Sequence, residues 1–395
     1  MTNLLKKNIL VYYISIVLIS LTKALPHSIL TLILFEKGLT IANIAVVQAM
    51  YSLAILLFEV PSGLWADLYS RKQLYILSNI MLLIMCLLIY YSHNYYLICF
   101  IWFLYGVSES INSGTIEATI INDIKKENNS KLHINRFIKL SNQFSLVAVI
   151  IGSLLGSYLY FNYGLKFYFL SIVLCFLSIL IISIFFEEYS TPILKGNASL
   201  KQQIKVSIYE LKRSRELKLL FILSIVNQVF FQTHFQLWQA LFLEKGWNSN
   251  KLYILYILFQ TLAILAYSVP ILNFNNGQNH LKFLLIFSIV PPLFLHVSNI
   301  YVVLLLYTYS VLVFTVIEYI LTNSFANKVT TQNISSLTSM KSSLSRISAI
   351  LILVSSSYFL NIYSIQYIVT FNFLLSLILL IGISIFYKIK IHNKY

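Results

Sequence analysis

Long apolar runs recur along almost the whole chain, and they constrain its fold more than any other feature. Many of the runs reach the ~20 residues that a helix needs to cross a bilayer, and short polar loops separate them. Of the 395 residues, 58% are hydrophobic and 10% are charged, whereas a soluble domain carries about 25% charged residues. Burying this much apolar surface needs a bilayer, so we expect an all-α integral membrane protein.

The runs accommodate twelve spanning helices, with both ends of the chain on the same side. The first run is too long for a signal peptide and lacks a small-residue cleavage site, so we assign it as the first span. Pro26, Pro61 and Pro270 are expected kink sites, because proline removes a backbone donor. The expected spans are 8–34, 41–65, 74–91, 96–122, 137–160, 166–186, 218–243, 250–272, 281–297, 300–325, 334–360 and 366–387.

The longest polar stretch divides the chain into an N-terminal half (1–186), a cytoplasmic linker (187–217) and a C-terminal half (218–395). With the N-terminus inside, 22 of the 28 Lys and Arg residues fall on the inner side, while Lys23 and Arg346 fall within spans. This bias predicts cytoplasmic termini in the plasma membrane. The net charge of +15 therefore reflects topology, and we expect no nucleic-acid partner.

The two halves share short matching segments in the same order. Residues 35–38 read FEKG and residues 243–246 read LEKG; Pro61 matches Pro270, and Glu117 matches Glu318. The matched positions lie between 201 and 209 residues apart. A parallel duplication of six spans is a transporter architecture, with the site between the halves near mid-membrane.

The loop after the second span carries the motif that identifies a family. Residues 63–72 read GLWADLYSRK. This segment resembles the loop signature of the major facilitator superfamily: Gly63, Asp67, Arg71 and Lys72 match it, and Ser70 replaces the usual glycine. The resemblance implies a bacterial, efflux-permease-like secondary transporter. Its twelve helices would form two six-helix parallel repeats, and we expect it to be a monomer.

The resemblance implies that this loop is a conformational gate, which locks the inner ends of the halves together in the outward-open state. Asp67 would pair with a cation or a helix end of the other half, and Arg346 is the candidate partner. In the corresponding loop of the second half, Asn276 aligns with Asp67, so the latch would be one-sided. The alternative is that Arg71 and Lys72 only set topology.

Span five carries Gly152 and Gly156 in a reduced form of the glycine-rich motif typical of antiporters in the family. The proline expected in that motif is absent, and span four lacks the usual arginine. The simpler interpretation is tight helix packing through small residues.

Charged residues within spans are costly and usually functional. In this family spans one, four, seven and ten line the cavity, and most of the candidates fall on them. Structural roles are the alternative: Glu117 could pair with a loop lysine, Glu59 could bind backbone groups freed by Pro61, and His27 could be a packing residue. The cavity and coupling candidates are Lys23, His27, Glu59, Glu109, Glu117, Asn227, Gln228, Gln232, His234 and Glu318.

These features favour a secondary active transporter that exports a small amphipathic or cationic compound in exchange for protons. Proton-coupled import of a metabolite is the alternative; a membrane glycan polymerase or a glycan flippase of another fold fits less well. The sequence has no phosphate-binding Gly-Lys-Ser/Thr loop, metal cluster or nucleophile triad. We therefore expect no enzyme activity, metal or cofactor, with the proton gradient as the driving force.

Overall fold

The computed structural model describes residues 2–127, 130–188, 208–267, 288–329 and 334–392. Within these ranges every regular element is a helix. Nine segments of the described chain are long and apolar enough to cross a membrane, and one of them, Leu132–Phe185, contains two helices. The structure therefore confirms an all-α membrane protein, while the expected count of twelve spans stays a prediction.

The chain divides into two compact units. The first consists of Met1–Asn43, Met50–Leu194 and Ser249–Ile257, and the second of Ile44–Ala49, Lys195–Asn248 and Leu258–Tyr395. We call them the N-terminal half and the C-terminal half, after the spans that make up most of each.

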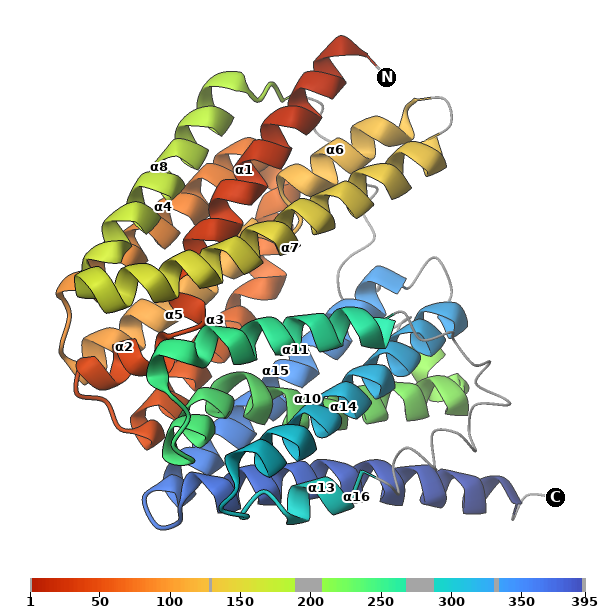
Figure 1. Cartoon of the computed structure of the whole chain (residues 1–395). Helices are drawn as coiled ribbons and strands as arrows, with labels where there is room; N and C mark the ends of the chain where they lie inside the picture. The colour runs from red at the N-terminus through yellow and green to blue at the C-terminus, as the bar shows by residue number, and fades with distance from the viewer. Residues whose placement is uncertain (1, 128–129, 189–207, 268–287, 330–333, 393–395) are drawn as a thin grey trace. The chain divides into compact units, whose positions relative to one another are not determined.

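In the N-terminal half, α1 packs against α7 and α8, and α4 packs against α5 and α8 (Figure 1). These contacts bury Ser15 of α1, whose hydroxyl lies 2.8 Å from the Tyr75 hydroxyl and 2.6 Å from the Ser178 hydroxyl. The helices of this half are α1 (Asn3–His27), α2 (Leu30–Glu36), α3 (Ile41–Leu68), α4 (Arg71–Tyr91), α5 (Tyr95–Asn112), α6 (Ile116–Lys125), α7 (Ser130–Tyr163) and α8 (Phe167–Phe185), with the 3-10 turn Gly164–Lys166 before α8.

Glycines set the distance between α1 and α7. A Cβ atom added at Gly156 would lie 1.8 Å from the Leu25 carbonyl oxygen, and one at Gly152 would lie 2.7 Å from Ala24 Cβ. No side chain fits at Gly156 without moving the backbone of α1. This geometry is that of tight helix packing.

Two of the expected spans are broken helices. The first divides into α1 and α2 just after Pro26, and the Ile29 amide donates to the Pro26 carbonyl at 3.2 Å. The fourth divides into α5 and α6 at Gly114, whose φ of 74° is a conformation that glycine adopts without strain. By contrast, α3 continues through Pro61, and Pro270 lies outside the described residues.

In the C-terminal half, α10 packs against α14, α15 and α16 (Figure 1). The helices of this half are α10 (Arg215–Glu244), most of α11 (Leu252–Tyr267), α13 (Val290–Leu293), α14 (Ile300–Lys328), α15 (Ile334–Leu360) and α16 (Ile365–His392). The 3-10 turn Ser249–Lys251 and the start of α11 belong to the other unit. Of the expected span 281–297, residues 281–287 lie outside the described residues, and the described remainder contains only the short helix α13 and turns.

The repeat is visible in matching helix ends. Lys37 follows the last residue of α2 and Lys245 follows the last residue of α10, and the next residues, Gly38 and Gly246, have φ values of 82° and 84°. The Lys37 ammonium donates to the Ser92 carbonyl at 2.8 Å, and that of Lys245 donates to the Val297 carbonyl at 3.0 Å. Each lysine thus fastens its turn to the loop that precedes span four or span ten.

Candidate functional site

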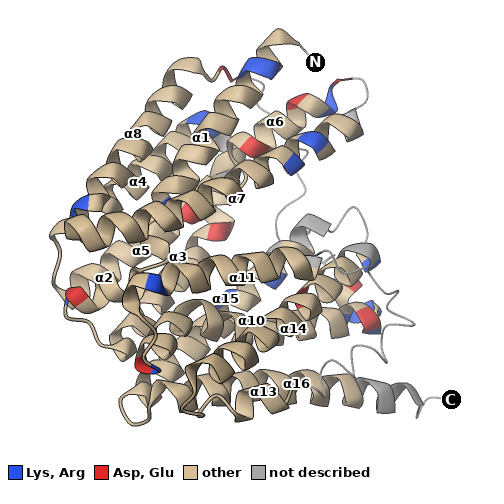
Figure 2. Ribbon diagram, viewed as in Figure 1, with Lys and Arg blue, Asp and Glu red and all other residues tan. Residues whose placement is uncertain are grey.

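Charged side chains are sparse along the helices (Figure 2), and several of those within the helices meet a partner in their own half. In the N-terminal half, Lys23 of α1 forms an ion pair with Glu109 of α5, and each side chain is 25% exposed. One turn before Glu109, α5 approaches α3 closely, since a Cβ at Gly106 would lie 2.5 Å from the Tyr51 carbonyl oxygen. This close contact fixes the height and rotation of α5, and with them the position of Glu109.

The C-terminal half holds a second ion pair, built around Glu318 of α14. Its Oε1 lies 3.6 Å from the Lys341 ammonium of α15 and accepts a hydrogen bond from the Thr322 hydroxyl at 3.1 Å. Its Oε2 accepts from Asn227 Nδ2 of α10 at 2.8 Å. The Lys341 and Glu318 side chains are only 14% and 17% exposed, and the Lys341 ammonium also lies 5.6 Å from the centre of the Phe325 ring.

The Glu318 cluster adds one residue, Lys341, to the candidates. Its side chain, on α15, is largely buried. The sequence contained a signal for this, because Lys341 lies inside the expected span 334–360. Which acid it would meet was not visible in the sequence, since the pairing depends on how α14 and α15 pack.

Glu117 lies on the first turn of α6, after the break in span four, with Tyr12 of α1 nearby. Its repeat-related residue, Glu318, is hydrogen-bonded to a polar side chain of the first span of its half, Asn227. Both acids thus lie near a polar side chain of the first span, although α14 is continuous where span four is broken. A lysine completes the contacts of Glu318. Tyr12 was not recognised from the sequence, where it looks like one more aromatic residue of an apolar run.

The polar side chains of α10 do not share one environment. His234 Nδ1 lies 3.0 Å from the Tyr307 hydroxyl of α14, and the imidazole ring packs among Phe230, Phe259 and Tyr307. His234 therefore belongs to the aromatic core of the C-terminal half. Gln232 is also buried, at 8% exposure, whereas Gln228 is half-buried.

Two further candidates lie at interrupted or proline-containing parts of helices. His27 is the last residue of α1, next to the break, and its side chain is exposed. Glu59 is half-buried, two residues before Pro61, and its backbone carbonyl accepts a hydrogen bond from the Ser62 hydroxyl at 3.1 Å.

The expected gate motif, residues 63–72, covers the end of α3, the two residues between the helices and the start of α4. Gly63 lies in open surroundings, with no described atom within 4 Å of an added Cβ, and the Asp67 side chain lies outside what the structure describes. Arg71 Nε donates to the Ala66 carbonyl at 3.2 Å, and Lys72 donates to carbonyls at the end of α8. Arg346 lies on α15 with a half-buried side chain, and its pairing with Asp67 stays a prediction.

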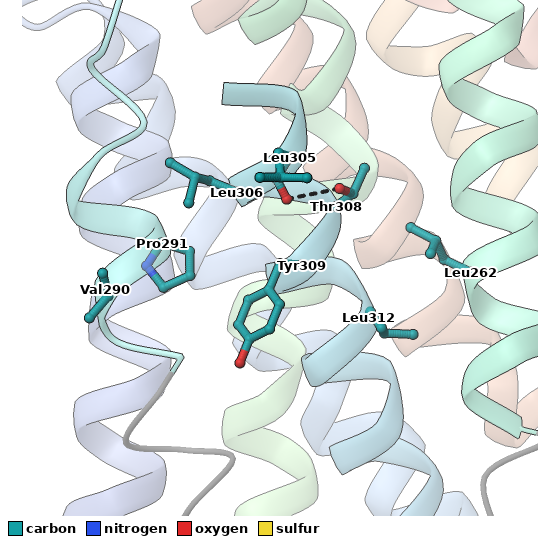
Figure 3. Close-up of a pocket in the computed structure, with 8 residues that line it drawn as sticks. All are labelled: Leu262, Val290, Pro291, Leu305, Leu306, Thr308, Tyr309 and Leu312. Carbon is teal, nitrogen blue, oxygen red and sulfur yellow. Dashed lines mark hydrogen bonds between the residues drawn. The ribbon is translucent and has the colours of Figure 1, made fainter. Parts of the chain in front are cut away.

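An apolar groove of about 560 Å³ lies on the C-terminal half (Figure 3). None of the eight residues that line it is charged, and Leu305 and Val290 are 70% and 52% exposed. A surface of this kind suits acyl chains, so we do not assign it as a solute site. Its residues come from α11, α13 and α14: Leu262, Val290, Pro291, Leu305, Leu306, Thr308, Tyr309 and Leu312.

Solved structures share this fold. A point mutant of the nucleoside transporter NupG superposes with a TM-score of 0.77 over 95% of this chain and 98% of its own, at 14% identity. A bacterial homolog of the human lysosomal transporter Spinster, inward-facing and occupied, gives 0.71 over 98% and 97%, at 12% identity.

A curated relative and a family model connect the chain to one family. An uncharacterized MFS-type transporter of Bacillus subtilis (strain 168), YxaM, is 25% identical over 246 residues, which are 60% of this chain and 60% of that protein. The sequence model of the Major Facilitator Superfamily matches residues 12–333. The chain therefore belongs to the Major Facilitator Superfamily.

Proposed function

We propose that this chain is a proton-coupled secondary transporter that exports a small amphipathic or cationic compound by alternating access. The observation that carries the proposal is that each half contains its own Lys–Glu ion pair, Lys23–Glu109 in one and Lys341–Glu318 in the other. The first pair joins spans one and four, and the second pair joins spans ten and eleven. Family membership argues against the glycan polymerase and the glycan flippase of another fold.

The ion pairs offer a physical route to proton coupling. A charge in the membrane interior is tolerated when it is paired, and removing one partner of a buried pair is strongly destabilising. Protonation of Glu109 would leave the Lys23 ammonium uncompensated, and protonation of Glu318 would do the same to Lys341. Proton binding would thereby favour a conformation in which the lysine reaches water or another partner, which is how a ligand shifts a conformational equilibrium.

The ion pair of Lys23 argues against import of an anionic metabolite. Binding an anion would need a cation with no acid beside it, whereas Lys23 is paired with Glu109. Import of a neutral hydroxylated solute is the second candidate, because α10 carries amide side chains such as the half-buried Gln228, and NupG, which shares the fold, is a nucleoside transporter. We therefore choose ethidium as a probe for export of a cation and uridine as a probe for import.

The test uses everted membrane vesicles for ethidium and right-side-out vesicles for uridine, each with an imposed pH gradient. Export predicts that everted vesicles accumulate ethidium, that an uncoupler abolishes accumulation, and that ATP depletion does not. Glu109→Gln should abolish gradient-driven accumulation, whereas Lys166→Gln, in the turn before α8, should not. Uridine accumulation would select the import alternative. Accumulation that survives the uncoupler would contradict proton coupling.

A further inference from the structure

Glu188, the third residue after α8, binds to the start of α4 in the N-terminal half. The Glu188 carboxylate accepts hydrogen bonds from the amides of Arg71 at 2.9 Å and of Lys72 at 3.4 Å, and from the Ser70 hydroxyl. The first amides of a helix have no partner within the helix, and the helix dipole makes this end positive. The carboxylate therefore occupies the position at which an anion stabilises α4.

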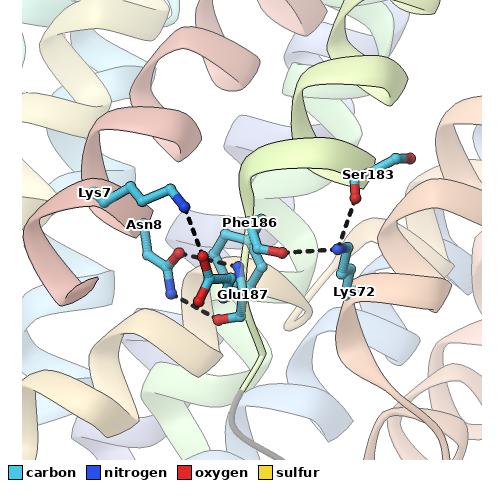
Figure 4. Close-up of polar contacts among 6 residues, drawn as sticks. All are labelled: Lys7, Asn8, Lys72, Ser183, Phe186 and Glu187. Atoms are coloured by element: carbon cyan, nitrogen blue, oxygen red, sulfur yellow. Dashed lines mark hydrogen bonds and ion pairs between the residues drawn. The ribbon is translucent and has the colours of Figure 1, made fainter.

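The opposite contact is made at the end of α8. The Lys72 ammonium donates to the carbonyls of Phe186 at 2.7 Å and Ser183 at 2.9 Å (Figure 4). These carbonyls belong to the last turn of α8 and the residue after it, which form the negative end of the helix dipole. Glu188, just after α8, thus places a negative charge at the positive end of α4, and Lys72 of α4 places a positive charge at the negative end of α8. We call these contacts the reciprocal clamp.

The neighbouring residue, Glu187, fastens the same segment to α1. Asn8 Nδ2 donates to the Glu187 carbonyl at 2.8 Å, and the Glu187 amide donates to Asn8 Oδ1 at 3.1 Å (Figure 4). The Glu187 carboxylate lies 2.6 Å from the Lys7 ammonium, with both side chains about half exposed. Residues 187 and 188 therefore join the inner ends of α1, α4 and α8.

We propose that Glu188 is a positioning residue of the gate loop, and that the segment which follows α8 is part of the gate. Ser70 and Arg71 belong to the loop motif itself, so the carboxylate fixes where the motif ends and α4 begins. Ser70 adds a third contact, because its hydroxyl donates to the Glu188 carboxylate and a glycine there would have no hydroxyl to donate. The clamp makes the loop move with α1 and α8 as one block.

Hydrogen–deuterium exchange of the purified full-length protein tests the clamp without a substrate. Glu188→Gln removes the charge that holds the amides of Arg71 and Lys72, so exchange in residues 70–73 should become about tenfold faster. Glu187→Gln is the matched control, because its carboxylate contacts Lys7 and not α4; it should leave this exchange within twofold. The N-terminus of α5, which Asn94 caps, reports whether each variant is folded.

Glu188→Asp and Ser70→Ala distinguish positioning from general stability. Aspartate keeps the charge and should recover part of the protection, while Ser70→Ala should lose protection by a smaller factor than Glu188→Gln. Unchanged exchange at 70–73 in Glu188→Gln, or an equal effect of Glu187→Gln, would overturn the proposal. The consequence for transport rests on the proposed function: ethidium turnover should fall in Glu188→Gln with an unchanged KM. If the wild type moves no ethidium, the proposed function fails while the exchange result still decides the clamp.

Discussion

The Glu318 carboxylate meets an ammonium, an amide and a hydroxyl group, from Lys341, Asn227 and Thr322. Both charged side chains are largely buried, so the pair holds two ions out of water. Desolvation offsets much of the attraction between such ions, but loss of one partner leaves a buried charge with nothing to compensate it. Replacing Glu318 and Lys341 together should therefore cost little stability, whereas replacing only one of them should cost much more.

We predict that Glu318→Gln lowers stability by about 3–5 kcal/mol, because Lys341 is left uncompensated. The double variant with Lys341→Met should recover most of this loss. Thermal unfolding in detergent measures the effect, and the control is Glu216→Gln, which removes an exposed pair with Lys328 that should contribute at most about 1 kcal/mol. If Glu318→Gln unfolds at the wild-type temperature, the cluster does not hold its charges as described.

At the residue scale, the sequence shows which charged residues lie within spans but not which residues they contact. Glu109 and Glu318 stand out in apolar runs because each is an isolated charge. Their partners depend on helix rotation, which a single sequence does not determine. Glu188 illustrates the other limit, since it lies just after an apolar run and looks like an ordinary solvated residue.

Among the elements, the contact of α1 with α7 depends on Gly156. We predict that Gly156→Ala destabilises the protein by about 1–3 kcal/mol, the range for overpacking, because the added Cβ would meet the Leu25 carbonyl oxygen at 1.8 Å. Gly382→Ala is the matched control, since nothing lies within 4 Å of its added Cβ. Thermal unfolding compares the two, and equal unfolding temperatures would argue against this close approach.

The paired turns at Lys37 and Lys245 predict a pH dependence of stability. Burial lowers the pKa of both ammonium groups, and the neighbouring Glu36 and Glu244 oppose part of this effect. At pH values between the lowered folded-state pKa and the unfolded-state pKa of ~10.4, the unfolded chain binds more protons than the folded protein. These lysines therefore make stability rise with pH in that range. Above the unfolded-state pKa both states are deprotonated at these residues, and stability no longer depends on pH through them.

Replacing both lysines with methionine should remove that contribution. We expect the double variant to be less stable, because the Ser92 and Val297 carbonyls lose their donors, and its unfolding temperature should rise less between pH 8 and pH 10 than that of the wild type. The unfolding temperatures of both proteins, measured across this pH range, test this expectation. Parallel plots of unfolding temperature against pH would contradict the lowered pKa values of the two lysines.

Element boundaries were predictable mainly where glycine or proline favours the end of a helix. The break after Pro26 lies beside an expected kink site, and Gly38 and Gly246 end helices as glycine commonly does. The break at Gly114 was not anticipated, because an isolated glycine within an apolar run does not by itself end a helix. The continuity of α3 through Pro61 shows that proline alone is also not decisive.

For the whole molecule, the distribution of Lys and Arg predicts cytoplasmic termini and an inner linker. A membrane-impermeant maleimide should label Asn250→Cys, in the turn before α11, on intact cells. It should label Tyr209→Cys, an exposed residue of the linker, only after permeabilisation. The opposite pattern would invert the topology and with it the direction assigned to the vesicle assays.

The whole-molecule fold was the most predictable level, because apolar runs, the repeat and the loop motif all indicated one family. The substrate was the least predictable. Exported cations and imported solutes can both be accommodated by acidic, aromatic and amide side chains, so composition does not distinguish them. The proposed proton coupling lies between these extremes, since it rests on two ion pairs whose partners only the structure identifies.

Proton movement in liposomes that contain the purified protein and a trapped pH-sensitive dye tests that coupling most directly. An outward ethidium gradient, at equal pH on both sides, should acidify the lumen, because each exported cation is exchanged for protons. Protein-free liposomes, Glu109→Gln and Glu318→Gln should show no acidification. Ethidium efflux through the wild type with no change of lumenal pH, or acidification in both variants at the wild-type rate, would contradict proton coupling through these two ion pairs.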